Sequence, residues 1–253
     1  MNFENKTAIV TGAASGMGLL FSKCFAKLGG NVVMCDVNTQ RLSEETDEIN
    51  KNSKGKAMGL FCDVRDYSNV CTIAKETFET FGSIDIVANF AGGTAVRMQN
   101  VDRILHPEFP DVPIEVFDWG IDVNLKGPFY FAHAVLKYMR LQQSGLILNI
   151  GSITGQEGDG YGMEYPTSKA GLMFGLTKSI AQFGAKYNIR CVCISPGPVL
   201  TREAMANMKT LLGRAAEPQE IIDLCLFVAS EKGQFINGEN ILIDGGRNAM
   251  HRG

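Results

Sequence analysis

The sequence predicts an α/β fold in which a doubly wound, mainly parallel sheet of seven strands carries helices on both faces. Short apolar runs alternate along the chain with longer segments of helical periodicity, which is the pattern of an open parallel sheet. The short runs are continuously apolar, as strands buried on both faces must be. No internal repeat or Pro/Ser-rich linker divides the chain. Residues 1–253 are therefore predicted to form a single domain that carries its own substrate pocket.

The first half of the chain holds four of the expected strands, each rich in apolar and β-branched residues. They lie at 7–11, 31–35, 56–62 and 84–90. Three helices with apolar residues at helical spacing lie between them, at 16–28, 40–50 and 67–81. The first of these helices ends where Gly29 and Gly30 supply a C-terminal stop signal.

The second half continues the alternation with longer helices. Expected strands lie at 146–150, 189–194 and 241–243, and expected helices at 113–143, 161–186 and 218–229. Pro128 interrupts the helix 113–143, and proline has no N–H to donate to the carbonyl of Asn124. We expect a kink there that frees this carbonyl for ordered water. The plainer alternative is a bend around the sheet, with another side chain as the partner.

Composition and charge exclude several classes of protein. Of the residues, 45% are apolar and 20% charged, unlike a collagen-like or disordered chain. The formal net charge of −3 and the absence of basic runs argue against nucleic acid as a partner. The seven scattered cysteines form no CxxC pair, so we expect reduced thiols and no metal site. The chain shows no signal peptide and no membrane-spanning run, so we expect a cytoplasmic protein.

Three glycines between the first strand and the first helix indicate phosphate binding. Gly12 can make a tight turn, Gly16 lets a backbone approach a pyrophosphate, and Gly18 lets helix and strand pack closely. Ser15 and Met17 lie in the same loop. The free N–H groups and the positive dipole end of the following helix favour an anion. An ordinary turn is the alternative, but the position directly after the first strand favours a nucleotide.

An acidic residue, Asp36, follows the second strand, 18 residues after Gly18. Its carboxylate can accept both hydroxyls of an adenosine ribose and would repel a 2′-phosphate. No Arg or Lys stands within the glycine loop or at residues 35–38, and Arg41 is the nearest. A strand-end turn aspartate is the alternative. We therefore expect NAD as the cofactor, in preference to NADP.

Tyr165 and Lys169 lie four residues apart in a predicted helix and therefore on one face of it. A lysine cation a few ångströms away stabilises a phenolate, which is what proton exchange with an alcohol requires. Such pairs also occur on ordinary helix surfaces. Ser152 follows the strand 146–150, at the carboxyl end where ligands gather in such sheets. A helix or turn cap is the alternative for this serine.

Together these features resemble the short-chain dehydrogenase/reductase family, in its one-domain form of about 250 residues. The resemblance runs from Lys6 to Gly246. The matched pieces are the glycine loop at 11–18, Asp63, Asn89-Phe90-Ala91-Gly92, Asn124, Ser152, Tyr165 with Lys169, and Pro196-Gly197. Each piece is weak alone, and their common order makes the match specific. Phe90 departs from the family, which usually has Asn or Ala there, and we expect it to pack against the fold.

The resemblance implies a Rossmann fold, bound NAD and a set of residue roles. It makes Tyr165 the general acid/base, Ser152 the holder of the substrate oxygen, and Lys169 the residue that binds the nicotinamide ribose and stabilises the phenolate. It implies that Asn124 takes part in a water-linked proton route from Lys169 to solvent. Cofactor contacts are implied for Asp63 and Val64 at the adenine, for Asn89, Ala91 and Gly92 in the cofactor groove, and for Pro196, Val199 and Thr201 at the nicotinamide.

We expect an enzyme that moves a hydride between NAD and a secondary alcohol or ketone. An NADPH-dependent 3-oxoacyl reductase is the alternative within the enzymes, and Asp36 disfavours it. A catalytically silent nucleotide-binding scaffold and a methyltransferase are alternatives of other classes. Neither needs Ser152, Tyr165 and Lys169 together.

Two segments are expected to wall the substrate pocket, 93–116 and 201–217. The first is about ten residues longer than the resemblance leads us to expect, and a solvated loop is the plainer interpretation of its charges. Candidate substrate contacts are Arg97 in this segment, Thr154 beside the predicted serine, and Met205 in the second segment. The helix 165–186 carries apolar residues on most sides, which predicts a homo-oligomer, and the resemblance implies a tetramer. A fully buried central helix is the alternative.

Overall fold

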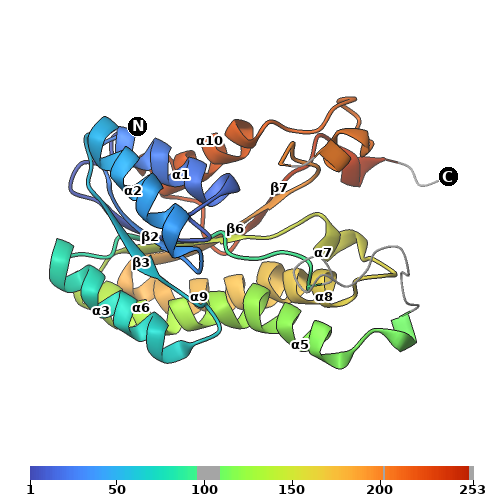
Figure 1. The fold of residues 1–253 in the computed structure, drawn as a ribbon, viewed down its shortest axis with the longest axis horizontal. Helices are drawn as coiled ribbons and strands as arrows, with labels where there is room; N and C mark the ends of the chain where they lie inside the picture. Colours follow the sequence, from blue (N-terminus) through green and yellow to red (C-terminus); the bar gives the residue numbers. More distant parts are fainter. Residues whose placement is uncertain (96–108, 202, 251–253) are drawn as a thin grey trace.

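The computed structural model describes residues 1–95, 109–201 and 203–250, and a seven-stranded sheet runs through its centre (Figure 1). The strand order is β3-β2-β1-β4-β5-β6-β7, and each pair of neighbours is parallel. The chain therefore winds outward from β1 in one direction and from β4 in the other. Ligands of such sheets bind at the carboxyl ends of the strands where this reversal occurs. The predicted doubly wound fold is confirmed.

The elements lie close to their predicted positions. The strands are β1 Thr7–Thr11, β2 Asn31–Asp36, β3 Ala57–Phe61, β4 Ile86–Asn89, β5 Gly145–Ile150, β6 Ile189–Pro196 and β7 Asn240–Ile243. The α-helices of the described residues are α1 Gly16–Lys27, α2 Thr39–Asn52, α3 Tyr67–Phe81, α5 Ile114–Ile121, α6 Gly127–Gln142, α7 Thr154–Glu157, α8 Glu164–Ala170, α9 Thr177–Gly184 and α10 Pro218–Ala229.

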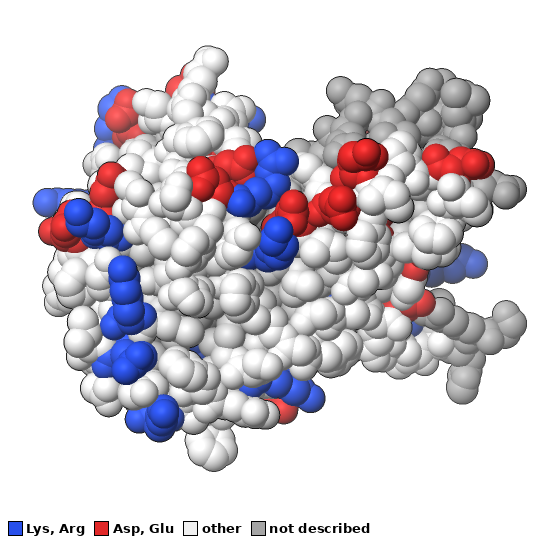
Figure 2. Space-filling model, turned by 90° about the horizontal axis from the view of Figure 1, so that it is seen from below, with Lys and Arg blue, Asp and Glu red and all other residues white. Residues whose placement is uncertain are grey.

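Helices cover both faces of the sheet. Helices α1, α2 and α10 lie on one face, and α3, α6 and α9 lie on the other (Figure 1). Figure 2 views the molecule from the side of the second group, where charged side chains gather in the upper middle and along the left side, and the area below the middle is largely uncharged. The two helical layers leave the carboxyl ends of the strands as the open edge of the sheet.

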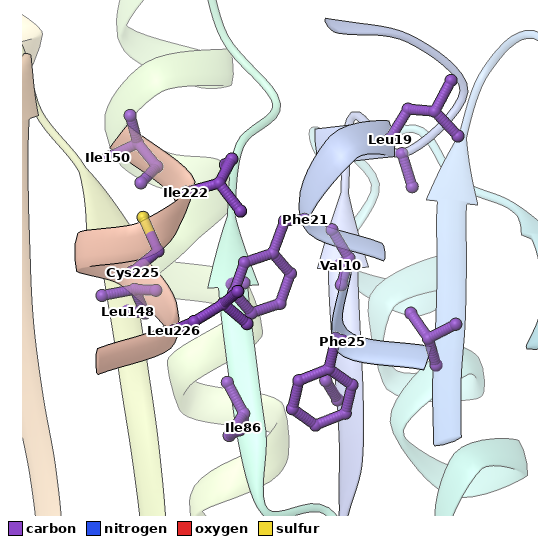
Figure 3. Close-up of a cluster of buried hydrophobic side chains, with 14 of the residues drawn as sticks. Val10, Leu19, Phe21, Phe25, Ile86, Leu148, Ile150, Ile222, Cys225 and Leu226 are labelled. Carbon is purple, nitrogen blue, oxygen red and sulfur yellow. The ribbon is translucent and has the colours of Figure 1, made fainter. Parts of the chain in front are cut away.

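The core on the α1 side is built from aromatic and aliphatic side chains. Phe21 and Phe25 of α1 and Leu226 of α10 point toward one another above the sheet (Figure 3). Phe90 packs on this cluster, with its ring centroid 5.5 Å from that of Phe21. The residue that departs from the family pattern is therefore a packing residue, as predicted.

Two of the long predicted helices continue through π-helical turns. Asp122–Lys126 joins α5 to α6, and Gly171–Leu176 joins α8 to α9. In the first turn the N–H of Gly127 donates to the carbonyl of Asp122, five residues back. Pro128 follows directly, and the wider turn accommodates its missing N–H. Turns of this kind are frequent at functional sites.

All seven cysteines are free thiols, as the sequence predicts. Five of them are buried, and desolvation raises the pKa of Cys193 to about 11. Such thiols stay protonated and pack as small apolar groups. Within the described residues, no helix is both long enough and apolar enough to cross a membrane.

Candidate active site

The glycine loop after β1 has a backbone that only glycines allow. Gly12 has a φ of +65°, and a Cβ there would lie 2.9 Å from the nitrogen of Ala91. A Cβ on Gly18 would lie 2.3 Å from the carbonyl oxygen of Gly12. Gly16 also has a positive φ, of +56°, but no atom lies within 4 Å of its Cβ position. The loop is therefore tightly packed at Gly12 and Gly18 and open at Gly16. The open position fits an approaching pyrophosphate.

Asp36 lies at the end of β2, directly beside this loop. One carboxylate oxygen accepts the N–H of Ala14 and the other accepts the N–H of Asn38, both at 3.0 Å. These two bonds fix the carboxylate and leave lone pairs on each oxygen. No ion pair within the described part of the chain involves Asp36. Its charge is therefore available to a ribose.

Asp63 follows β3 and is held in place by Arg65. The guanidinium binds both carboxylate oxygens, at 2.6 Å for the shortest pair, and it lowers the pKa of Asp63. Val64 between them is 8% exposed and lies against Gly127, which marks the start of α6. Asp63 and Val64, the predicted adenine contacts, therefore lie on a firmly held loop next to the end of β2.

Asn89 is the last residue of β4, and Ala91 lies two residues beyond it. The amide of Asn89 donates to Asn149 on β5, whose own amide donates to Thr177 on α9. The N–H of Ala91 donates to the hydroxyl of Thr11. Asn89 therefore joins the sheet to the helical layer through buried side chains, and any contact with a cofactor falls to the backbone that follows it.

Ser152 lies two residues beyond the end of β5. Its hydroxyl oxygen accepts the N–H of Thr154 and lies 3.2 Å from the hydroxyl oxygen of the same residue. The N–H of Ile153 donates to the carbonyl of Pro196 on β6. The loop is thus fastened to the neighbouring strand, and the two hydroxyls form one polar group beside it.

Tyr165 and Lys169 lie on α8, which packs against this loop. The ammonium of Lys169 donates to the carbonyl of Ile150 at 2.7 Å. It also lies 5.6 Å from the centre of the Tyr165 ring. Only 5% of the lysine is exposed. Ile150 is the last residue of β5. The lysine therefore joins α8, and with it Tyr165, to the carboxyl end of β5, two residues before Ser152.

Asn124 lies in the π turn and is fully buried. Its amide nitrogen donates to the carbonyls of Gly93 and Gly120, at 3.0 and 2.9 Å. Its amide oxygen accepts the N–H of Gly93 at 2.9 Å. The side chain therefore holds the segment after β4, a task that the sequence did not reveal. The water-linked proton route through its carbonyl stays a prediction.

The segment after β6 forms the remaining wall. Val199 pairs with Ala216 in an isolated parallel bridge, and the N–H of Thr201 donates to the carbonyl of Val199. Met205 lies in a short 3₁₀ helix. Arg97 lies outside the described residues. Within them, no group of three or more potential ligands could hold a metal ion.

Two contacts near these residues, one buried and one partly buried, escaped prediction. Glu164, directly before Tyr165, is only 3% exposed and accepts the N–H of Ala95. Arg247 binds both oxygens of Glu157. An acidic residue at the start of a helix was a visible signal for the first contact. Nothing local in the sequence marks the second.

The sheet order and the glycine loop define a Rossmann fold with polar side chains at its ligand-binding edge. A solved structure of L-sorbose reductase from Gluconobacter frateurii, complexed with NADPH and L-sorbose, has the same fold. It superposes with a TM-score of 0.88 over 99% of both chains, at 24% sequence identity.

The sequence itself matches known families and proteins. A family profile described as "Enoyl-(Acyl carrier protein) reductase" matches residues 12–248. The 7alpha-hydroxysteroid dehydrogenase of Bacteroides fragilis is 32% identical, covering 96% of this chain and 95% of that one. The NAD-dependent glycerol dehydrogenase of Listeria innocua is 31% identical, covering 97% and 94%.

The chain belongs to the short-chain dehydrogenase/reductase family. It is an oxidoreductase of the class that acts on alcohols and ketones. A nicotinamide cofactor, NAD or NADP, is typical of this family. The open space above Gly16 and the fixed carboxylate of Asp36 fit such a dinucleotide.

Proposed function

We propose that the protein is an NAD(H)-dependent oxidoreductase that interconverts a secondary alcohol and a ketone, with Tyr165 as the general acid/base. The observation that carries this proposal is that the ammonium of Lys169 lies beside the Tyr165 ring and binds the last carbonyl of β5, two residues before Ser152. These three lie at the edge of the sheet where the glycine loop opens. A scaffold protein or a methyltransferase has no use for this arrangement.

Each of the three side chains has one task. The hydroxyl of Ser152 donates a hydrogen bond to the substrate oxygen and sets its position. In alcohol oxidation the oxygen of Tyr165 takes the hydroxyl proton, and in ketone reduction it returns one. The ammonium of Lys169 stabilises the phenolate form by its charge. A nicotinamide bound beside the tyrosine would supply the hydride acceptor or donor.

The dinucleotide would lie along the carboxyl edge of the sheet. The glycine loop, with Ser15 and Met17, would hold the pyrophosphate, Asp36 the adenosine ribose, and Asp63 and Val64 the adenine. The backbone from Asn89 to Gly92 would line the groove, and Lys169 would hold the nicotinamide ribose. The nicotinamide would rest against Pro196, Val199 and Thr201.

NAD is the proposed cofactor because Asp36 presents a negative charge at the ribose. A carboxylate accepts both ribose hydroxyls and repels a 2′-phosphate. The NAD-dependent relative supports this choice, and the NADPH bound in the L-sorbose reductase structure shows that the fold accepts either cofactor. An NADPH-dependent 3-oxoacyl reductase is the second candidate, and Asp36 argues against it.

Protons lost or gained by Tyr165 need a route to solvent. Asn124 stands in a wider helical turn directly before Pro128. We propose that its carbonyl holds a water molecule that links Lys169 to solvent, because a buried carbonyl needs a partner and ordered water can supply one.

The substrate is proposed to lie against Thr154 and Met205, with Arg97 as a further contact. Thr154 supports this because its hydroxyl adjoins that of Ser152. The relatives act on a hydroxysteroid and on glycerol by their names, so size and polarity stay open.

We propose that the protein works as a homo-oligomer in the cytoplasm. Free cysteines suit a reducing compartment. Phe129 on α6, Phe174 before α9 and Phe183 on α9 are all more than 40% exposed. Three exposed phenylalanines on adjacent helices support a subunit contact on this face, part of which is largely uncharged (Figure 2).

The test offers the protein a panel of alcohols with NAD and, separately, with NADP. Reduction of the cofactor is followed at 340 nm, roughly the absorbance maximum of NADH. The panel contains a 7α-hydroxysteroid, glycerol, sorbitol and a 3-hydroxyacyl thioester. We expect turnover of at least one alcohol with NAD. Binding of NADH without turnover on any member would favour the silent scaffold.

A further inference from the structure

Glu164 is a buried carboxylate that the proposed reaction does not use. It lies in the first turn of α8, directly before Tyr165, and is 3% exposed. Burying a carboxylate is unfavourable unless hydrogen bonds hold it. The helix N-terminus favours the negative charge to a small extent. This position therefore needs a specific partner.

The partner is the backbone of the segment that follows β4. The N–H of Ala95 donates to Oε1 of Glu164 at 3.1 Å, and Ala95 is fully buried. On α5, Gly120 makes room for the side chain, because a Cβ there would lie 2.3 Å from Cγ of Glu164. The room for this side chain therefore depends on the absence of a Cβ at Gly120.

The segment 92–95 lies against helices of the active site at three points and is hydrogen-bonded at two of them. A Cβ on Gly92 would lie 3.4 Å from the ammonium of Lys169, so the backbone passes close beside that group. Gly93 exchanges two hydrogen bonds with the side chain of Asn124. Ala95 is the third point. Two of the residues that this segment contacts, Lys169 and Asn124, are residues that the proposed reaction needs.

We propose that Glu164 is a positioning residue, which ties the segment after β4 to helix α8 and so fixes one wall of the substrate pocket relative to Tyr165. The carboxylate touches no reacting atom and acts through the backbone N–H of Ala95. The part of this proposal that concerns substrate rests on the proposed function. The hydrogen-bond acceptor carries the role, and the negative charge does not. Glutamine at position 164 should therefore preserve the hydrogen bond from Ala95, whereas the shorter Asp and Ala should lose it.

Hydrogen–deuterium exchange reads the contact directly and needs no substrate. We expect the Ala95 amide of E164A and E164D to exchange about tenfold faster or more than in the wild type, because its acceptor is gone. E164Q and the control E115A, which alters an exposed glutamate on α5, should exchange as the wild type does. Unchanged exchange at Ala95 in a folded E164A or E164D overturns the proposal.

Kinetics with the best alcohol of the panel test the consequence for substrate. We expect E164A and E164D to raise the KM for the alcohol about tenfold, while the Kd for NADH stays within about twofold of the wild type. E164Q should restore the wild-type KM. If E164Q is impaired as strongly as E164A, the charge carries the role and the proposal is wrong. If the wild type turns over no alcohol, the proposed function fails, and the exchange experiment still decides on the contact.

Discussion

At the scale of single residues, the proposed reaction depends on the hydroxyl of Tyr165. Phenylalanine at this position removes the proton donor and keeps the ring. The bond from Lys169 to the carbonyl of Ile150 does not involve the tyrosine and should persist. We expect kcat of Y165F to fall by about 100-fold or more, with the Kd for NADH unchanged in a fluorescence titration. Turnover close to that of the wild type would contradict the role of Tyr165.

Cofactor preference is the second property that one residue should control. Asp36→Ala removes the carboxylate that would bind the ribose hydroxyls and repel a 2′-phosphate. We expect the preference for NAD over NADP to narrow by about tenfold or to reverse, since hydrogen bonds to a charged group contribute about 1.5–3 kcal/mol. The ratio of kcat/KM for the two cofactors measures it. Equal values for both cofactors in the unmutated protein would refute this assignment.

At the scale of elements, Arg247 joins three segments near the proposed pocket. Its guanidinium binds Glu157 at the end of α7 and the carbonyl of Lys209. The arginine side chain is 24% exposed and the glutamate side chain 11%. We expect R247A to lower the free energy of unfolding by about 2 kcal/mol and to speed cleavage by trypsin after Lys209. R41A is the control, because Arg41 is exposed and its contact with Glu45 is long, at 3.8 Å.

Arg247→Lys keeps the charge and loses the bidentate hydrogen bond. Its free energy of unfolding and its rate of cleavage should therefore lie between those of R247A and the wild type. Denaturant unfolding and timed proteolysis measure both effects. Equal proteolysis of R247A and R41A would mean that Arg247 does not restrain the segment around Lys209.

The start of α10 should respond to acid. Arg214 binds both carboxylate oxygens of Glu220, which lowers the pKa of Glu220 to about 2. A carboxyl whose pKa is lower in the folded state stabilises the fold above its unfolded pKa, and this stabilisation is lost as the pH falls. The loss should occur between about pH 4.5 and pH 2.

The measurement is the Tm of the wild type and of E220Q across this range. We expect E220Q to be less stable at pH 7, and the difference to vanish near pH 2. E79Q is a suitable control, because the pair of Glu79 with Lys75 is exposed and 3.7 Å long. A difference between E220Q and the wild type that does not change with pH would argue against this ion pair as its source.

At the scale of the whole molecule, the sequence predicted the sheet, and it nominated the residues of the candidate site, because both depend on local patterns. Strands buried on both faces are continuously apolar, and the glycines, Asp36 and the Tyr165–Lys169 spacing are each visible within a short stretch. The contacts that hold the site could not be predicted. Asn124 bonds to Gly93 across 31 residues, and Arg247 to Glu157 across 90. Periodicity places helices against a sheet, but it does not choose partners at such separations.

The oligomeric state is the property of the whole molecule that we expect to depend on the exposed aromatic residues. Phe174 and Phe183 are each 45% exposed on the helical layer that also carries Phe129. One sheet cannot cover these rings, so burial against a second copy is the favourable outcome. We expect light scattering at micromolar concentration to give about 110 kDa, four times the chain mass of 27.5 kDa. The double variant F174E/F183E should lower this mass, because it would bury like charges at the contact. A wild-type mass near that of one chain would contradict the proposed assembly, and an unchanged mass in the variant would place the contact elsewhere.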